Sequence, residues 1–214
     1  MPGNSRRPPT TLVLFVRHGQ TPTTGKVLPG RAPGLHLADE GIAQAEATAA
    51  RIGAAGPVAA IYSSPLERAQ ETAAPIAAHT GLPVEIEPGL LECDFGSWTG
   101  AELATLRRKP EWATVQHCPS AWQFPDGESF LSMQERILTT VARLCRAHPG
   151  QAVVAVSHAD PIKAVVAAAA GVPLDLMQRL VISPCSVSAL LFTVGGPAIL
   201  CVNSTGSLSE LVLS

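Results

Sequence analysis

The sequence predicts a three-layer α/β/α sandwich, in which a mostly parallel sheet carries helices on both faces and ends in a C-terminal hairpin. Short apolar runs of strand length alternate with longer, alanine-rich segments of helical composition. This alternation is typical of βαβ units, whose parallel strands are buried on both faces. The last two β-favouring runs are separated only by Gly195-Gly196-Pro197, a spacing that favours an antiparallel hairpin.

The first half of the chain predicts three strands and two helices. The first strand, Leu12–Val16, is too short for a helix and ends abruptly at Arg17-His18-Gly19. A helical segment opens at Leu37–Gly41, with the acidic Asp39 near its start, and runs to about Ala54, just before Gly56-Pro57. The remaining elements are a strand over 59–63, a helix from Ser64 to near Gly81, and a short strand over 83–87.

The second half contains a long irregular segment, Leu90–Pro125, which holds all three tryptophans and one predicted helix near Ala101–Lys109. An irregular segment of this length is more often a lid or binding wall than a simple connection, so we expect a lid over about 90–128. Beyond it we expect helices over 129–148 and 161–170, a strand over 152–157, and hairpin strands over 187–193 and 198–203.

Composition limits the function classes. No Pro/Gly/Ser-rich linker divides the 214 residues, so one domain is expected over 11–214, after a flexible N-terminus over 1–10. The 15 basic and 17 acidic residues include no basic run, which disfavours nucleic-acid binding. No apolar run reaches membrane-spanning length. The five cysteines lack a Cys-x-x-Cys pair, so we expect reduced thiols in a cytoplasmic protein and no metal site.

Charged side chains follow three of the predicted strands. They are Arg17-His18 after the first strand, Arg68 a few residues after the second, and His158 after the fourth. Carboxyl ends of parallel strands meet at one sheet edge, so these residues should converge there. An arginine lowers the pKa of a neighbouring histidine, and a neutral imidazole is a nucleophile. Because a guanidinium receives phosphate oxygens well, the combination predicts a histidine that attacks phosphorus.

Five motifs extend this pattern, and with them the chain resembles the histidine phosphatase superfamily, in its phosphoglycerate-mutase-like branch. The stretch Glu-Cys-Asp-Phe-Gly-Ser-Trp-Thr-Gly is similar to one in a group of probable phosphomutases. The resemblance covers Thr11 to Asn203 and implies a phosphoglycerate-mutase-like fold. The motifs, in family order, are Val16–Thr21, Ser63–Ala73, Leu91–Gly100, Pro125–Ser129 and Val156–His158.

The resemblance implies a phosphatase that hydrolyses small phosphomonoesters through a phosphohistidine on His18, without cofactor or metal. A carbonyl would hold Nδ1–H of His18 so that Nε2 attacks. Arg17 and Arg68 would clamp the phosphoryl oxygens, and His158 would add a hydrogen bond and charge. Glu92 would be the general acid, with its pKa raised by Asp94 and by burial beneath Trp98. Further substrate contacts are expected from Gly19, Gln20, Thr21, Arg31 and Ala159.

Several alternatives stay open. Asp94 and Glu128 compete with Glu92 for the acid role, and Arg31 is as easily a solvated surface residue. The family commonly has glycine where this chain has Ala159; alanine is tolerable there at negative φ, but the following Asp160 adds an anion that disfavours highly charged substrates. A cofactor-primed phosphoglycerate-type mutase is the first alternative function, although the segment from Glu92 to His158 is short for one. A catalytically weak phosphate-binding module is the second, and the resemblance also suggests a homodimer.

Overall fold

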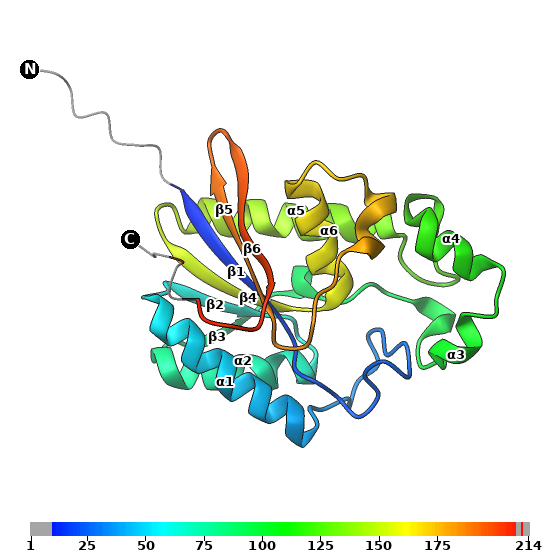
Figure 1. Cartoon of the computed structure of the whole chain (residues 1–214), viewed down its shortest axis with the longest axis horizontal. Coiled ribbons are helices and arrows are strands. Elements are labelled where there is room, and N and C mark those ends of the chain that lie inside the picture. Colours follow the sequence, from blue (N-terminus) through cyan, green and yellow to red (C-terminus); the bar gives the residue numbers. More distant parts are fainter. Residues whose placement is uncertain (1–9, 209–210, 212–214) are drawn as a thin grey trace, which may run out of the picture.

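The computed structural model describes residues 10–208 and 211, and it contains one six-stranded sheet with the strand order β3-β2-β4-β1-β5-β6. The four strands β1 to β4 are parallel, whereas β5 pairs antiparallel with β1 and with β6 (Figure 1). The predicted mostly parallel sheet with a C-terminal hairpin is therefore confirmed. The strands are β1 Thr11–Arg17, β2 Ala60–Ser63, β3 Val84–Ile86, β4 Ala152–Ser157, β5 Val187–Thr193 and β6 Gly196–Ser204.

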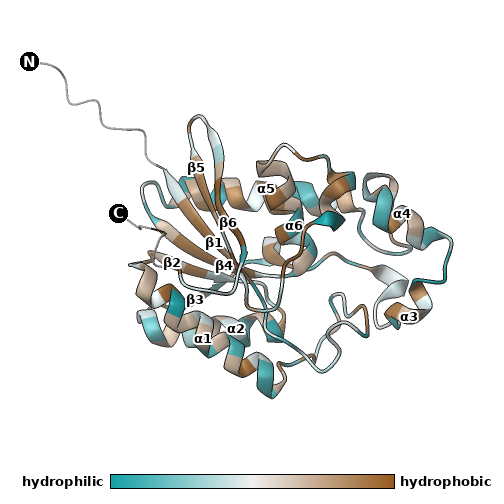
Figure 2. Cartoon of the chain, viewed as in Figure 1, coloured by the Kyte–Doolittle hydropathy of each residue, from teal (hydrophilic) through white to brown (hydrophobic). Residues whose placement is uncertain are grey.

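Helices cover both faces of the sheet, as a three-layer sandwich requires. Alternate residues of β1 face opposite ways: Leu12 and Leu14 pack with α1 and α2, while Val13 and Phe15 pack with α5 and α6. The central strands β1 and β4 are mostly hydrophobic along their length (Figure 2), because both of their faces are buried. The principal helices are α1 Asp39–Ala55, α2 Glu67–Thr80, α5 Phe130–Ala147 and α6 Ala159–Ala169.

The segment between β3 and α5 differs in part from its prediction. The single helix expected over Ala101–Lys109 is only one turn, α3 (Leu103–Leu106), and a second helix, α4 (Glu111–His117), follows it. Pro110 separates the two, since proline suits the start of α4 but cannot continue α3. Short 3-10 turns at Pro88–Leu90, Gly96–Trp98, Pro119–Ala121 and Leu174–Arg179 were not predicted.

The order of the strands positions the predicted site. The strands β2, β4 and β1 are neighbours, with Ser63 paired to Val156 and Arg17 paired to Ser157 at their carboxyl ends. The segments that begin at His18, Ser64 and His158 therefore leave the sheet at one edge, as the sequence predicts.

Some sequence expectations concern other parts of the molecule. The predicted flexible N-terminus lies, apart from Thr10, outside the described residues. Within residues 10–208, no helix combines the length and hydrophobicity needed to span a bilayer.

Candidate active site

His18 lies at the end of β1 with its ring buried. Its Nδ1 is 2.8 Å from the carbonyl oxygen of Gly19. A carbonyl only accepts, so Nδ1 carries the proton and Nε2 keeps its lone pair. Burial, together with the charges of Arg68 and Arg17, lowers the pKa of His18 to about 3. The imidazole is therefore neutral at physiological pH, in the tautomer expected of an Nε2 nucleophile.

Arg68, in the first turn of α2, is the largest fully buried side chain in the described part of the chain. Its Nη2 donates to the Gly30 carbonyl at 2.7 Å and lies 3.3 Å from Nδ1 of His158. Its Nε and Nη1 are buried and have no hydrogen-bond partner among the described residues. Buried donors of this kind are costly unless a ligand accepts from them, so this guanidinium is suited to an anion.

Arg17 adds a second guanidinium. Its Nη1 donates to the Ile182 carbonyl at 2.6 Å, while its Nε is a further buried donor that lacks a partner within residues 10–208. The two arginines come from different elements, the end of β1 and the start of α2. Together they present three buried donor nitrogens without a hydrogen-bond partner in the described structure, an arrangement suited to binding an anion.

His158 follows β4 and is completely buried. An arginine donates only, so the contact with Arg68 makes Nδ1 of His158 an acceptor, and Nε2–H donates to Oγ of Ser64 at 2.8 Å. Burial, then the charge of Arg68, lowers the pKa of His158 well below its usual value. The sequence predicts a hydrogen bond and charge from this residue, but here both ring nitrogens have protein partners and the ring is neutral.

Glu92 is buried, and its Oε1 accepts a hydrogen bond from the backbone N–H of Cys93 at 2.9 Å. Burial and then the charge of Asp160 raise the pKa of Glu92. The charges of Arg68 and Arg17 oppose this shift, and the resulting pKa is about 7. A carboxyl group with this pKa holds a proton for part of the time at neutral pH, as a general acid must.

Of the two predicted causes of the raised Glu92 pKa, burial is confirmed and the charge of Asp94 is wrong. Asp94 was expected to raise the pKa, but its carboxylate is turned to Arg31, at 3.6 Å, and accepts from the Gly96 amide. The anion that raises the Glu92 pKa is Asp160, in the first turn of α6. Trp98 packs in an aromatic cluster, with ring centroids 6.4 Å from Trp112 and 5.2 Å from Trp122.

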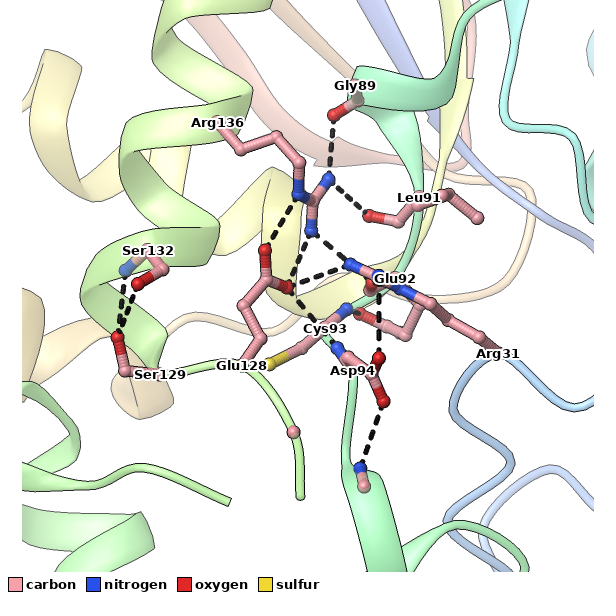
Figure 3. Close-up of polar contacts among 12 residues, drawn as sticks. Arg31, Gly89, Leu91, Glu92, Cys93, Asp94, Glu128, Ser129, Ser132 and Arg136 are labelled. Carbon is pink, nitrogen blue, oxygen red and sulfur yellow. Dashed lines mark hydrogen bonds and ion pairs between the residues drawn. The ribbon is translucent and has the colours of Figure 1, made fainter. Parts of the chain in front are cut away.

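Glu128 is unsuited to the acid role because two guanidiniums neutralise it. Arg136 donates to both of its carboxylate oxygens, from Nε and from Nη2, at 2.9 Å each. Nη2 of Arg31 donates to Oε2, also at 2.9 Å, and Figure 3 shows Glu128 between the two arginines. Both carboxylate oxygens of Glu128 are therefore already engaged by arginine donors. Of the three acidic candidates, Glu92 is the one buried without a salt bridge to a cation.

The same arginines fix the backbone that carries Glu92. Arg31 Nε donates to the Glu92 carbonyl at 2.8 Å, and Arg136 Nη2 lies 3.3 Å from the same oxygen. Arg136 Nη1 also donates to the carbonyls of Gly89 and Leu91 (Figure 3). The sequence predicts Arg31 as a substrate contact. In the structure its guanidinium contacts the Glu92 carbonyl and the carboxylates of Glu128 and Asp94.

Gly19 is required by backbone packing. A Cβ on Gly19 would lie 2.6 Å from the carbonyl oxygen of Gly41 in α1, and one on Gly41 would lie 2.0 Å from that of Gln20. The two backbones cross with no side chain between them. Thr72 of α2 accepts from the Gly19 N–H at 3.0 Å. Gly19, which the sequence predicts as a substrate contact, thus brings its backbone against α1.

Three more predicted substrate contacts lie beside the site. The backbone N–H of Gln20 donates to Gln44, and the hydroxyl of Thr21 bonds within its own turn, to Thr23 and Thr24. Ala159 begins α6 directly after His158. Its φ is not positive, so alanine replaces glycine there without strain.

Sequence reasoning missed Ser64, Thr72 and Arg136. Ser64 and Thr72 fall inside a recognised motif, but their contacts depend on how the segments pack. Arg136 lies in α5 outside every motif, and no local signal links it to the backbone of residues 89–92. In the described part of the chain, no three or more His, Cys, Asp or Glu side chains cluster as a metal site would require.

Comparisons with known proteins agree with this arrangement. The chain matches the histidine phosphatase superfamily (branch 1) over residues 13–205. It is 34% identical over 208 residues to the bifunctional protein Rv2228c of Mycobacterium tuberculosis, which covers 95% of this chain but 56% of that protein. The chain thus spans little more than half the length of that relative. It is 33% identical over 155 residues to phosphoserine phosphatase 1 of Hydrogenobacter thermophilus, covering 70% of this chain and 72% of the relative.

Solved structures show the same fold. A mycobacterial glucosyl-3-phosphoglycerate phosphatase superposes with a TM-score of 0.81 at 26% identity, covering 91% of this chain and 99% of that one. A putative α-ribazole-5′-phosphate phosphatase of Escherichia coli gives 0.80 at 25% identity, covering 92% and 98%. With the family match over residues 13–205, these similarities show that the chain belongs to branch 1 of the histidine phosphatase superfamily.

Proposed function

We propose that this protein is a phosphatase that hydrolyses small phosphomonoesters through a phosphohistidine on His18, without a metal ion. The observation that carries the proposal is the neutral imidazole of His18, with Nε2 unprotonated, beside two guanidiniums with three buried donor nitrogens that lack a partner in the described structure. Its relatives include enzymes named as phosphatases, which supports the same class of reaction.

In the first step, Nε2 of His18 attacks phosphorus while the bond from phosphorus to the leaving oxygen breaks. The carboxyl group of Glu92 gives its proton to that oxygen, and an alcohol departs. The free N–H groups of Arg17 and Arg68 hold the equatorial oxygens as charge moves onto them. Because these donors are already buried and unpaired in the free protein, the hydrogen bonds they form with the anion are gained without further desolvation of the arginines.

In the second step, a water molecule attacks the phosphorus of the phosphohistidine. The Glu92 carboxylate takes one proton from the water, the N–P bond breaks, and inorganic phosphate leaves. The pKa of Glu92, about 7, suits both directions of proton transfer at neutral pH. The negative charge of the bound phosphoryl group favours a protonated His158, whose Nδ1 then becomes a donor.

The test is to trap the intermediate. After mixing with a phosphomonoester and rapid denaturation at high pH, we expect an acid-labile phosphoryl group on the peptide that contains His18, and steady turnover in excess EDTA. Absence of this adduct at every quench time, or turnover that EDTA abolishes, would contradict the proposal. With 3-phosphoglycerate and a bisphosphate primer, isomerisation that outpaces phosphate release would instead identify a mutase.

A further inference from the structure

A cavity of about 150 Å³ lies under the segment between β3 and α5. Four apolar side chains that line it, Phe95, Val115, Phe124 and Phe130, are almost completely buried. Asp160 and Gln178 are among its polar lining residues. None of the residues used so far in the two proposed steps lines this cavity, so its chemistry is independent of the phosphoryl transfer itself.

The cavity adjoins the catalytic residues on two sides. Asp160 lies two residues after His158, in the first turn of α6, and its charge acts on both Glu92 and Arg17. On the other side, Gly30 separates Phe95 from Arg68. Arg68 donates to the Gly30 carbonyl, and a Cβ on Gly30 would lie 3.2 Å from the Phe95 ring. A group attached to a phosphoryl group between the two arginines therefore has this cavity as a neighbour.

The charges around the cavity select against anions. Among the side chains that line it in the described structure, Asp160 is the one that carries a charge. Lys163, also in α6, lies 3.4 Å from Asp160 and donates to Gln178 at 2.8 Å, so its charge is already paired. A carboxylate on the leaving group would enter a mostly apolar space beside the Asp160 carboxylate, and none of the side chains that line the cavity is a cation that could receive it.

The volume and lining suit a flat apolar ring. An apolar cavity of about 150 Å³ accommodates one benzene-sized ring, and aromatic walls offer edge-to-face contacts. Phe95 and Phe124 already meet in this way, with ring centroids 4.9 Å apart, and Phe124 meets Phe130 at 5.3 Å.

We propose that the leaving group of the substrate carries an uncharged, ring-shaped apolar body that occupies this cavity, and that Asp160 disfavours leaving groups with a carboxylate. This inference rests on the proposed phosphatase activity. It names a substrate class that differs from phosphoserine and phosphoglycerate esters, whose leaving groups both bear a carboxylate.

The kinetic test compares three esters: benzyl phosphate, 4-carboxybenzyl phosphate and ethyl phosphate. We expect kcat/KM for benzyl phosphate to exceed the other two by at least about tenfold, since even one methylene in an apolar pocket is worth about 10- to 200-fold. Val115→Phe, which fills the cavity, should bring the benzyl-to-ethyl ratio toward one. The matched control Val194→Phe, at a position 78% exposed in the hairpin, should leave that ratio unchanged. Equal rates for the three esters, or a preference for the carboxylated one, would overturn the inference.

A second variant covers the case in which Val115→Phe does not fold. Val115→Ala enlarges the cavity and should shift the preference from benzyl to 4-methylbenzyl phosphate; an unchanged preference would count against occupancy of the cavity by the leaving group.

Binding is then measured without turnover, by saturation-transfer NMR with benzyl alcohol and inorganic phosphate. If no ester is hydrolysed, the proposed function is wrong, and the NMR signal from benzyl alcohol by itself tests whether the cavity binds a ring. Where Val115→Phe folds, a wild-type signal that this variant abolishes supports occupancy of the cavity. No signal in the wild type contradicts occupancy.

Discussion

The rings of His18 and His158 lie 5.1 Å apart, centroid to centroid, with their planes tilted by 57°. Arg68 contributes to lowering the pKa of both, so two neutral imidazoles share a pocket with two permanent cations. In the proposed mechanism, this division of charge would leave one ring free to act as the nucleophile while the arginines attract the substrate. A bound phosphate would also add negative charge beside His158 and favour its protonated form.

Replacing His18 with alanine should reduce kcat by at least about 10⁴-fold, because no other side chain can form the covalent intermediate. The melting temperature should stay close to that of the wild type or rise, since the substitution removes a buried polar ring. The control is His117→Ala, an exposed histidine at the end of α4, which should keep full activity in a phosphate-release assay. A His18→Ala variant with more than a few per cent of wild-type activity would rule out the proposed nucleophile.

The value of kcat/KM for an alkyl phosphate should fall as the pH rises through about 7. Glu92 must be protonated to donate to the leaving oxygen, and its raised pKa of about 7 keeps the proton in place only below that pH. Because the pKa of His18 is about 3, the loss of kcat/KM caused by protonating this ring occurs below the pH range of the assay. The check is to repeat the profile with p-nitrophenyl phosphate, whose leaving group needs no proton. The same fall above pH 7 with that ester would show that Glu92 is not the acid.

Substituting Arg68 with lysine should weaken inhibition by inorganic phosphate or vanadate and lower kcat/KM by about 10²–10³-fold. Lysine keeps the charge but cannot supply the Nε and Nη1 donors that lie unpartnered in the described structure. Arg107→Lys, at an exposed position after α3, is the matched control and should change neither quantity. Full retention of phosphate affinity in Arg68→Lys would refute the role given to these two donors.

Glu128→Gln tests whether the two arginines position the proposed acid. The amide keeps the size of the side chain but loses the charge that aligns Arg31 and Arg136 on the Glu92 carbonyl. We expect kcat to fall by about 10- to 100-fold with KM little changed, and the basic limb of the pH profile to move, since small displacements of a reacting group are costly. Glu135→Gln, one turn into α5 and exposed, is the control. A lower melting temperature with unchanged kcat and pH profile would indicate a purely structural cluster.

The sheet and its functional edge were predictable because their determinants are local. The apolar run Leu12–Val16 has a length and composition that only a buried strand satisfies, and the histidines follow strand ends directly. Parallel pairing then brings them together, as the register of Arg17 with Ser157 shows. The helix α4, Glu111–His117, was missed because a seven-residue element has too weak a periodicity to recognise.

The electrostatic surroundings of Glu92 were harder to predict. Asp94, two residues away in sequence, was the obvious neighbour, yet its carboxylate is paired with Arg31. The charge that raises the Glu92 pKa comes from Asp160, in another element. Likewise, the bonds from Arg136 to residues 89–92 span more than forty positions of the chain. Such contacts depend on tertiary packing that no spacing rule encodes.

The crossing of Gly19 and Gly41 has a consequence for how this protein tolerates substitution. The first turn of α1 and the loop after His18 touch atom to atom through their main chains. Any tilt of α1 must therefore also move the Gly19 carbonyl, which accepts the hydrogen bond from Nδ1 of the His18 imidazole. Stabilising the helix by the common exchange of glycine for alanine at Gly41 would misalign the reacting nitrogen, so rigidity can be engineered into α1 only further along its length.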